Sequence, residues 1–150
     1  MIPELVLRLA EHVHGHMGWL SAAALLHPAI LLRNPQRRAP LAVLLTTALV
    51  TATGLLGAWI YPEYRVRLKQ ALFIHTPAIG WLFERKEHLA VGAIGFAWIG
   101  CIAHLSAKSF GDASLERTVS VIAFRAYVIA VVLCVAVASI GVAVATTSTF

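Results

Sequence analysis

Histidines are the residues of this chain most able to do chemistry, because several lie in or beside apolar runs. Residues 11–38, EHVHGHMGWLSAAALLHPAILLRNPQRR, carry four imidazoles among side chains typical of a lipid-facing helix. An unpaired imidazole in hydrocarbon costs several kcal/mol of transfer free energy, so histidines at such positions are candidates for a functional site. His88 and His104 lie near the two ends of another apolar run. Which of these rings can meet depends on the helices that carry them.

The composition predicts an integral membrane protein. Of the 150 residues, 59% are hydrophobic and 13% are charged, whereas soluble domains average about 45–50% and about 25%. The net charge of +5 does not indicate nucleic-acid binding, because no basic face with interleaved aromatic residues is present and arginine-rich loops are a feature of membrane topology. We therefore expect membrane lipid, and no nucleic acid, among the partners.

Four apolar segments are long enough for a membrane span of about 20 residues. They cover approximately residues 12–32, 41–60, 87–106 and 119–145, and the first is interrupted by His27-Pro28. Short turns join the first span to the second and the third to the fourth. We therefore expect a single transmembrane domain over residues 1–150, folded as an all-α four-helix bundle. An even number of spans places both termini on the same side of the membrane.

The segment between the second and third spans, residues 61–88, is predicted to be interfacial. Basic residues alternate there with apolar and aromatic ones, which is typical of a segment lying in the headgroup layer. Its charges leave no uncharged stretch of spanning length, so residues 62–86 should lie along the membrane rather than cross it. Pro77 and Gly80 are expected to divide the segment into two short pieces.

The distribution of the histidines meets the needs of haem b ligation. In an antiparallel bundle, spans one and three run in the same direction, while spans two and four contain no histidine. Bis-histidine ligation requires one neutral imidazole from each of two helices, on opposite sides of the porphyrin. Four of the rings are predicted near one membrane face and two near the other: His12, His14, His16 and His88, then His27 and His104.

The angular spacing of the rings favours one haem over two. At about 100° per residue, His27 lies within about 20° of His16, so these two share a face of the first span, and His14 points away from it. On the third span, His88 and His104 are about 160° apart. Their axial separation of about 24 Å also exceeds the roughly 16 Å between His16 and His27.

His16 and His88 form the best candidate ligand pair for a haem iron or another metal ion. His16 is flanked by Gly15 and lies deeper than the first histidine of its run, while His88 opens the third span at the same depth. Glu84 or Glu87 could accept the second ring N–H of His88. Such an acceptor fixes the tautomer of the ring and makes the ligand more basic.

Arg125 is the other residue whose position would be costly in a membrane. It lies one to two turns inside the fourth span, close enough to the face for its side chain to snorkel to the surface. Its planar guanidinium would also suit a haem propionate or a lipid phosphate. At the level of His16 and His88, Arg85 or Lys86 would take that role instead.

This pattern resembles the four-helix integral-membrane b-type cytochromes, which include subunits of respiratory complexes. The resemblance rests on His16 or His14 with His88 near one face, and on His27 with His104 near the other. It implies an electron-transfer subunit that binds haem b between helices one and three, with other membrane subunits and a quinone or a cytochrome as partners. We expect a non-catalytic subunit of a redox complex, since no soluble catalytic domain accompanies the spans.

Other interpretations of the same residues remain open. Carboxylate and imidazole at one-turn spacing occur at Glu11-x-x-His14 and in FERKEH, as in di-metal carboxylate bundles, but the other two spans supply no further ligand. His12 and His16 share a face and could bind one copper or zinc ion. Individual histidines could instead lie hydrated in the interface beside a glutamate. An accessory subunit without any cofactor is the alternative from another functional class.

The basic residues divide evenly between the two predicted faces, so orientation depends on the arginine-dense, acid-free turn RNPQRRAP. The positive-inside rule favours this turn as cytoplasmic, with both termini periplasmic at a bacterial inner membrane. In the variant Gln36→Cys, a membrane-impermeant thiol reagent added to intact cells should leave the new cysteine unlabelled. Labelling from outside would reverse the assignment. Cys101 and Cys134 lie inside apolar runs, so they should give no background.

Overall fold

The computed structural model describes residues 2–147, and this part of the chain is helical throughout, with no strand. Loops of a few residues separate the helices. Along the chain the elements are α1 (Glu4–Leu31), α2 (Pro40–Tyr64), the π-helix η1 (Arg65–Lys69), α3 (Gln70–His75), α4 (Pro77–Ser106), the 3-10 helix η2 (Ala107–Phe110) and α5 (Ala113–Thr147). The predicted all-α class is confirmed.

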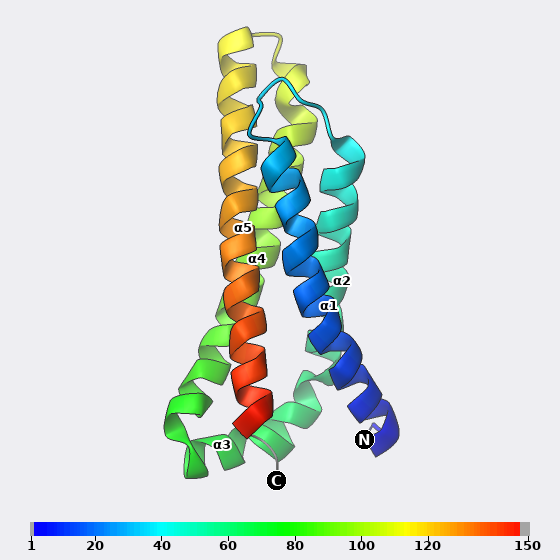
Figure 1. Cartoon of the computed structure of the whole chain (residues 1–150), viewed down its shortest axis with the longest axis vertical. Helices are drawn as coiled ribbons and strands as arrows, with labels where there is room; N and C mark the ends of the chain where they lie inside the picture. Colours follow the sequence, from blue (N-terminus) through cyan, green and yellow to red (C-terminus); the bar gives the residue numbers. More distant parts are fainter. Residues whose placement is uncertain (1, 148–150) are drawn as a thin grey trace.

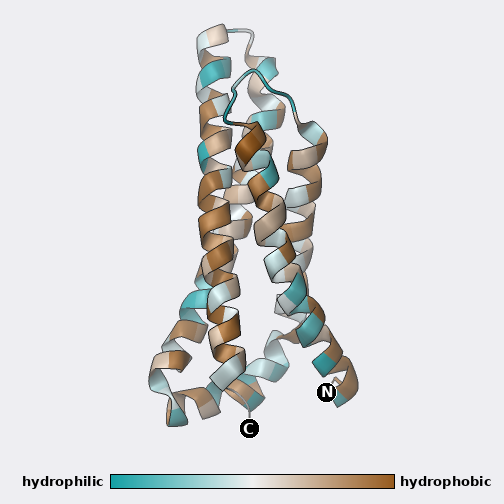
Figure 2. Ribbon diagram, viewed as in Figure 1, coloured by the Kyte–Doolittle hydropathy of each residue, from teal (hydrophilic) through white to brown (hydrophobic). Residues whose placement is uncertain are grey.

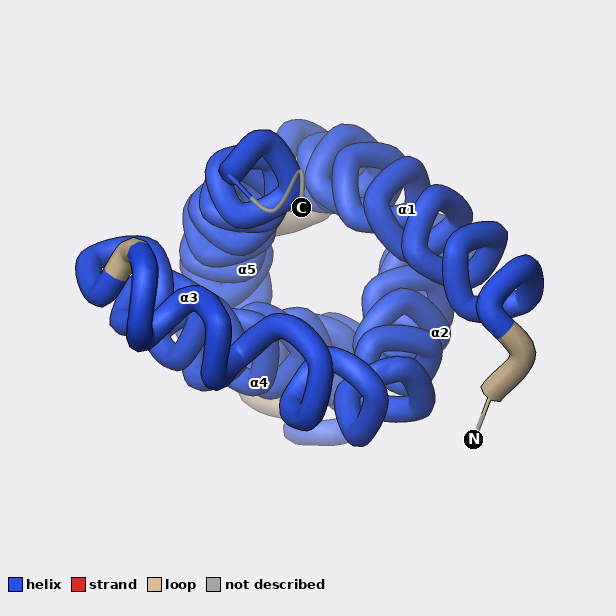
Figure 3. The backbone as a smooth tube through the Cα atoms, turned by 90° about the horizontal axis from the view of Figure 1, so that it is seen from below, coloured by secondary structure: helices blue, strands red, loops and turns tan. Residues whose placement is uncertain are grey.

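The four long helices lie side by side around a shared interior (Figures 1 and 3). Helix α1 packs against α2 and α5, and α4 packs against the same two helices. Helices α1 and α4 therefore stand diagonally opposite each other. The start of α1, the end of α5 and the short helix α3 lie at the same end of the molecule, which we call the terminal end (Figure 1). The other end carries the α1–α2 and α4–α5 connections and is called the loop end.

Three helical stretches are long and apolar enough to cross a membrane: Pro40–His75, Pro77–Phe110 and Ala113–Thr147. They contain the second, third and fourth predicted spans. Helix α1, which contains the first, is not among them, because its histidines and the charges of its first turns lower its hydropathy. Figure 2 shows these hydrophilic positions in the lower half of α1.

Two predicted breaks are absent from the helices. Pro28 lies inside α1, and the helix continues to Leu31 without interruption. Gly80 lies inside α4, so the predicted division of the surface segment at this glycine is wrong. A Cβ at Gly80 would lie 3.0 Å from the ring of Phe73, so the glycine allows close packing against α3. The break falls at Thr76 instead, because Pro77 disfavours helical geometry in the residue before it.

Asp112 sets the start of α5 by capping its first turn. Its Oδ1 accepts hydrogen bonds from the backbone N–H of Ser114, at 2.7 Å, and from the Ser114 hydroxyl, also at 2.7 Å. These bonds favour the charged carboxylate and lower the pKa of Asp112. Gly111 precedes it with a φ of +67°, in the left-handed region that glycine adopts without strain. The α4–α5 connection is therefore a defined turn.

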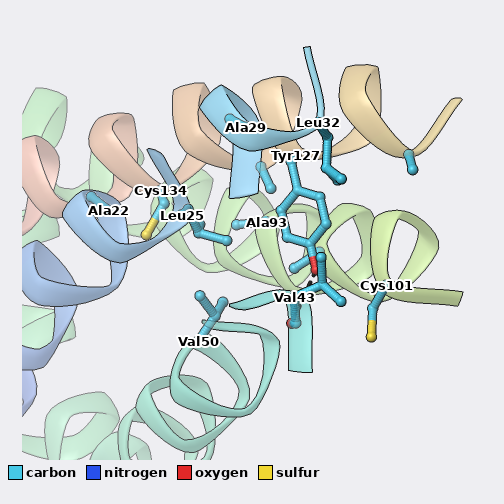
Figure 4. Packing of buried hydrophobic residues seen from close by; sticks show 13 residues of the cluster. Ala22, Leu25, Ala29, Leu32, Val43, Val50, Ala93, Cys101, Tyr127 and Cys134 are labelled. Atoms are coloured by element: carbon cyan, nitrogen blue, oxygen red, sulfur yellow. Dashed lines mark hydrogen bonds between the residues drawn. The ribbon is translucent and has the colours of Figure 1, made fainter. Parts of the chain in front are cut away.

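The main core lies between the four helices and is built largely from small residues around one aromatic ring (Figure 4). Tyr127 of α5 is fully buried. Its hydroxyl donates to the Val43 carbonyl at 3.1 Å and lies 2.9 Å from the Thr47 hydroxyl, both on α2. The ring fits against α4 only because residue 100 is glycine: a Cβ there would lie 2.8 Å from two ring carbons.

Gly100→Ala should destabilise the fold, since the added methyl group collides with the Tyr127 ring and has the Ala123 carbonyl 3.3 Å behind it. Overpacking of this kind costs about 1–3 kcal/mol of unfolding free energy. Thermal unfolding of the detergent-solubilised protein measures the loss. Gly95→Ala is the matched control, because nothing lies within 4 Å of its Cβ position. Equal stabilities of the two variants would contradict the packing described for Tyr127.

Candidate functional site

The histidine face predicted on the first helix lies on the outside of the molecule. His12, His16 and His27 are all exposed on α1. The His16 Nδ1–H donates to the His12 carbonyl at 2.7 Å, and the His12 Nδ1–H donates to the Arg8 carbonyl at 2.8 Å. Each of these two rings is thus tied to its own helix one turn earlier, with its other nitrogen turned away from the backbone.

His88, the predicted partner of His16, is also exposed and has the same local geometry. Its Nδ1–H donates to the Glu84 carbonyl at 2.9 Å. The expected acceptor was a glutamate carboxylate, and the structure uses the main-chain oxygen of Glu84 instead. Within residues 2–147, Nε2 of neither His16 nor His88 has a hydrogen bond. Both rings therefore present a nitrogen lone pair suited to a metal, but on the outer surface of diagonally opposed helices.

His14 is the histidine of this run that faces inward. It is half-buried, and its ring lies over Gly57 of α2: a Cβ at that glycine would be 2.8 Å from Cε1 and 3.3 Å from Nε2 of His14. Its Nδ1 is buried, and within the described residues it has no hydrogen-bond partner. The angular spacing already set His14 apart from His16. The contact between His14 and Gly57 could not be predicted from the sequence of either helix alone.

Two charged residues of α4 enter the same region, and sequence reasoning assigned neither to the interior. The Lys86 ammonium lies against α5, with Nζ 3.7 Å from the position of a Cβ on Gly141. Oε1 of Glu87 is the other buried side-chain atom that has no hydrogen-bond partner within residues 2–147. Lys86 and Glu87 are neighbours on α4, and both side chains are half-buried. We call His14, Lys86 and Glu87 the interior cluster.

A signal for the interior cluster was present in the sequence. Glu87 and His88 are neighbours, about 100° apart on one helix, so an outward His88 leaves Glu87 turned toward the interior side. The prediction assigned residues 61–88 to the headgroup layer and did not assign Lys86 or Glu87 to the interior of the helices. The structure instead continues α4 through this segment, so the helical period applies to Lys86 and Glu87 as well.

The remaining predicted residues lie at the loop end. His104 is half-buried, and its Nε2 accepts a hydrogen bond from the Ala39 N–H at 3.2 Å, which satisfies a donor at the start of α2. That bond occupies the nitrogen lone pair that a second haem, bound through His27 and His104, would need. Arg125 is exposed on α5, and its role with a propionate or a phosphate stays a prediction.

The predicted metal sites gain no support from the arrangement. Among residues 2–147, no group of three or more histidine, cysteine, aspartate or glutamate side chains lies close enough to hold a metal ion. The donor chemistry of His16 and His88 fits haem ligation. Their outward positions do not place an iron between them inside one chain. A haem ligated by both residues would have to lie between two copies of the chain, with His16 from one copy and His88 from the other.

Gly57→Ala should displace His14, because its new methyl group would lie 2.8 Å from the imidazole. We expect a changed ¹⁵N NMR signal of the His14 side chain and a loss of about 1–3 kcal/mol in unfolding free energy. Gly18→Ala on α1 is the control, since its Cβ position has no neighbour within 4 Å. Unchanged His14 signals in both variants would show that the ring does not pack on α2 as described.

No protein-family model, curated protein or solved structure matches this chain. The function has to be inferred from the residues themselves. Those residues offer two distinct chemical environments at the terminal end: outward imidazoles with a free Nε2, and an inward cluster of ionisable groups.

Proposed function

We propose that this protein is a membrane electron-transfer subunit that binds haem b through histidines of α1 and α4 within a larger redox complex. In this proposal all four long helices cross a bacterial inner membrane, with both termini periplasmic. Helix α1 crosses in the company of three more apolar helices, which cover its inward polar residues. The basic segment from η1 to the start of α4 lies in the headgroup layer.

One observation carries the proposal: His16 and His88 each have Nδ1–H bound to a carbonyl of their own helix. This bond holds the ring in the tautomer whose Nε2 has a lone pair, and it makes that nitrogen a better donor to iron. Both residues lie near the terminal end, on the two helices that the proposal requires. His75, by contrast, lies at the end of α3 and is not assigned to the cofactor.

The exposed positions of these rings indicate where the haem lies. Because α1 and α4 are diagonal, His16 and His88 of one chain face away from the interior. We infer that the haem lies at the outer surface between neighbouring copies of the chain, where His16 of one copy and His88 of the next ligate it and the helices around it exclude lipid. This arrangement requires membrane-protein partners. A quinone or a cytochrome would exchange electrons with the haem, and the haem iron would supply the redox chemistry.

The absorption spectrum of the purified protein, produced with ample haem, tests the proposal. Wild-type protein should show a Soret band. His16→Ala and His88→Ala should each remove it while leaving a helical circular-dichroism spectrum, because bis-histidine ligation fails when one imidazole is lost. Since both residues are exposed, neither substitution opens a cavity in the core.

His75→Ala is the matched control and should keep the Soret band. His14→Ala distinguishes a surface haem from one bound in the interior: loss of the band in this variant alone would move the ligand to the inward histidine. Absence of Soret absorption in the wild-type protein would refute the cytochrome proposal. A cofactor-free accessory subunit would then take its place.

A further inference from the structure

A groove follows the chain where α2 passes into η1 and α3, near the terminal end (Figure 1). It consists of two hollows with volumes of about 470 and about 550 Å³. Arg65 and Gln70 line both hollows, so the two adjoin. The other lining residues are apolar or aromatic except for one lysine: Tyr61, Pro62, Val66, Lys69, Phe73 and Ile74. We call this surface the η1 groove.

The lining residues form a row in which neighbouring pairs recur every four residues, from 61–62 to 73–74. In an α-helix such a row drifts by about 40° at each step, because four residues turn by about 400°. The hydrogen bonds of a π-helix join residues five apart, so within η1 four residues turn by less than a full circle and the row drifts back. The π turn therefore keeps the row on one face, and such turns occur frequently at functional sites.

Arg65 is the cation of η1 that has no carboxylate partner among residues 2–147. Arg67 pairs with Glu63 at 3.3 Å, and Lys69 pairs with Glu84 at 2.5 Å. Arg65 takes part in none of the ion pairs of the described residues, and its side chain is exposed. The η1 groove thus carries one uncompensated positive charge. A planar guanidinium in this state suits a single phosphodiester anion, which it can bind through two N–H groups.

The apolar part of the η1 groove suits an acyl chain. Val66 and Ile74 are 73% and 74% exposed, and covering such side chains with hydrocarbon is favourable. The exposed Trp81 packs edge-on against the Phe73 ring, with 5.6 Å between the ring centroids. Tryptophan is enriched where the hydrocarbon core meets the headgroups. Charge and apolar surface therefore adjoin as phosphate and acyl chain do in a phospholipid.

We propose that the η1 groove binds one anionic phospholipid, with its phosphate on Arg65 and an acyl chain along Val66, Phe73 and Ile74. The Gln70 carboxamide, between the two hollows, can donate to an ester carbonyl of the glycerol unit. Free phosphate shares the headgroup chemistry but would leave the apolar residues uncovered, so the groove favours the lipid. This inference rests on the membrane placement in the proposed function and does not depend on the haem.

Native mass spectrometry of the full-length protein in detergent tests this site. After addition of phosphatidylglycerol or phosphatidylcholine at equal concentration, the wild-type protein should retain one phosphatidylglycerol in preference. Phosphatidylcholine has the same phosphate but neutralises it with its own ammonium group. Arg65→Gln should weaken retention by roughly tenfold, the effect of losing one charge-assisted hydrogen-bonded contact. Ile74→Ser should also weaken retention, because the acyl chain loses an apolar contact.

Arg67→Gln is the matched control. It removes the same charge from the same turn, but Arg67 pairs with Glu63 and does not line the η1 groove. Arg65 and Ile74 are exposed, so their variants should keep the helical circular-dichroism spectrum of the wild-type protein. Equal retention of the two lipids by the wild-type protein, or equal weakening in Arg65→Gln and Arg67→Gln, would overturn the proposal.

Two further results would assign the η1 groove to another occupant and overturn the lipid site. Displacement of the lipid by inorganic phosphate at matched concentration would assign it to free phosphate. A chain–chain contact that is lost in Arg65→Gln and kept in Arg67→Gln would assign it to a second copy of the chain. The Soret band of the same samples separates this proposal from the cytochrome. Selective lipid retention without the band counts against the cytochrome alone, and the band without selective retention counts against the lipid site alone.

Discussion

Hydrogen-bond satisfaction in apolar surroundings is the constraint on which this structure depends. Helices with this composition have few polar side chains, and each one needs a local partner. The threonines of α2 show the usual solution: Thr46, Thr51 and Thr53 each donate to the carbonyl four residues earlier, at 2.7, 2.8 and 2.9 Å. Because these acceptors belong to α2 itself, the bonds use no acceptor on a neighbouring helix. Against that background, Nδ1 of His14 and Oε1 of Glu87 stand out as the buried side-chain atoms that have no hydrogen-bond partner within residues 2–147.

Small residues determine how closely the helices approach. Helices surrounded by lipid gain little from the hydrophobic effect, so close contact and dispersion stabilise their association. Gly100 leaves room for the ring of Tyr127, and Gly57 leaves room for the ring of His14. A glycine therefore allows close ring packing both in the apolar core and at the polar site. The two rings differ in whether their buried polar atoms have a hydrogen-bond partner. Tyr127 finds the Val43 carbonyl, while His14 brings a nitrogen that the described residues leave open.

The short run HVHGH places its histidines on opposite sides of one helix. His14 therefore lies on the inward side, while His12 and His16 lie on the outer surface. Residues two positions apart lie about 200° apart on a helix, so His14 points inward when His12 and His16 point outward. On α4 the adjacent residues Glu87 and His88 divide in a similar way. In our proposal the outward rings ligate a haem beside a partner subunit, and the inward groups take no part in the ligation.

Of the four spans predicted from the sequence, the second, third and fourth lie in helices apolar enough to cross a membrane, and the first does not. The sequence by itself determined these three, the helical class and the separation of His14 from His16, because they follow from composition and helical period. It could not show which face of α1 is buried, since both faces carry histidine and the choice depends on Gly57 of another helix. The sequence contained a signal for the inward side of Glu87 in its angle of about 100° to His88, but the continuation of α4 through this charged segment depends on packing against α3 and α5. Local pattern sets the period of a helix, whereas its rotation and the residues it buries are decided by contacts between helices far apart in the chain.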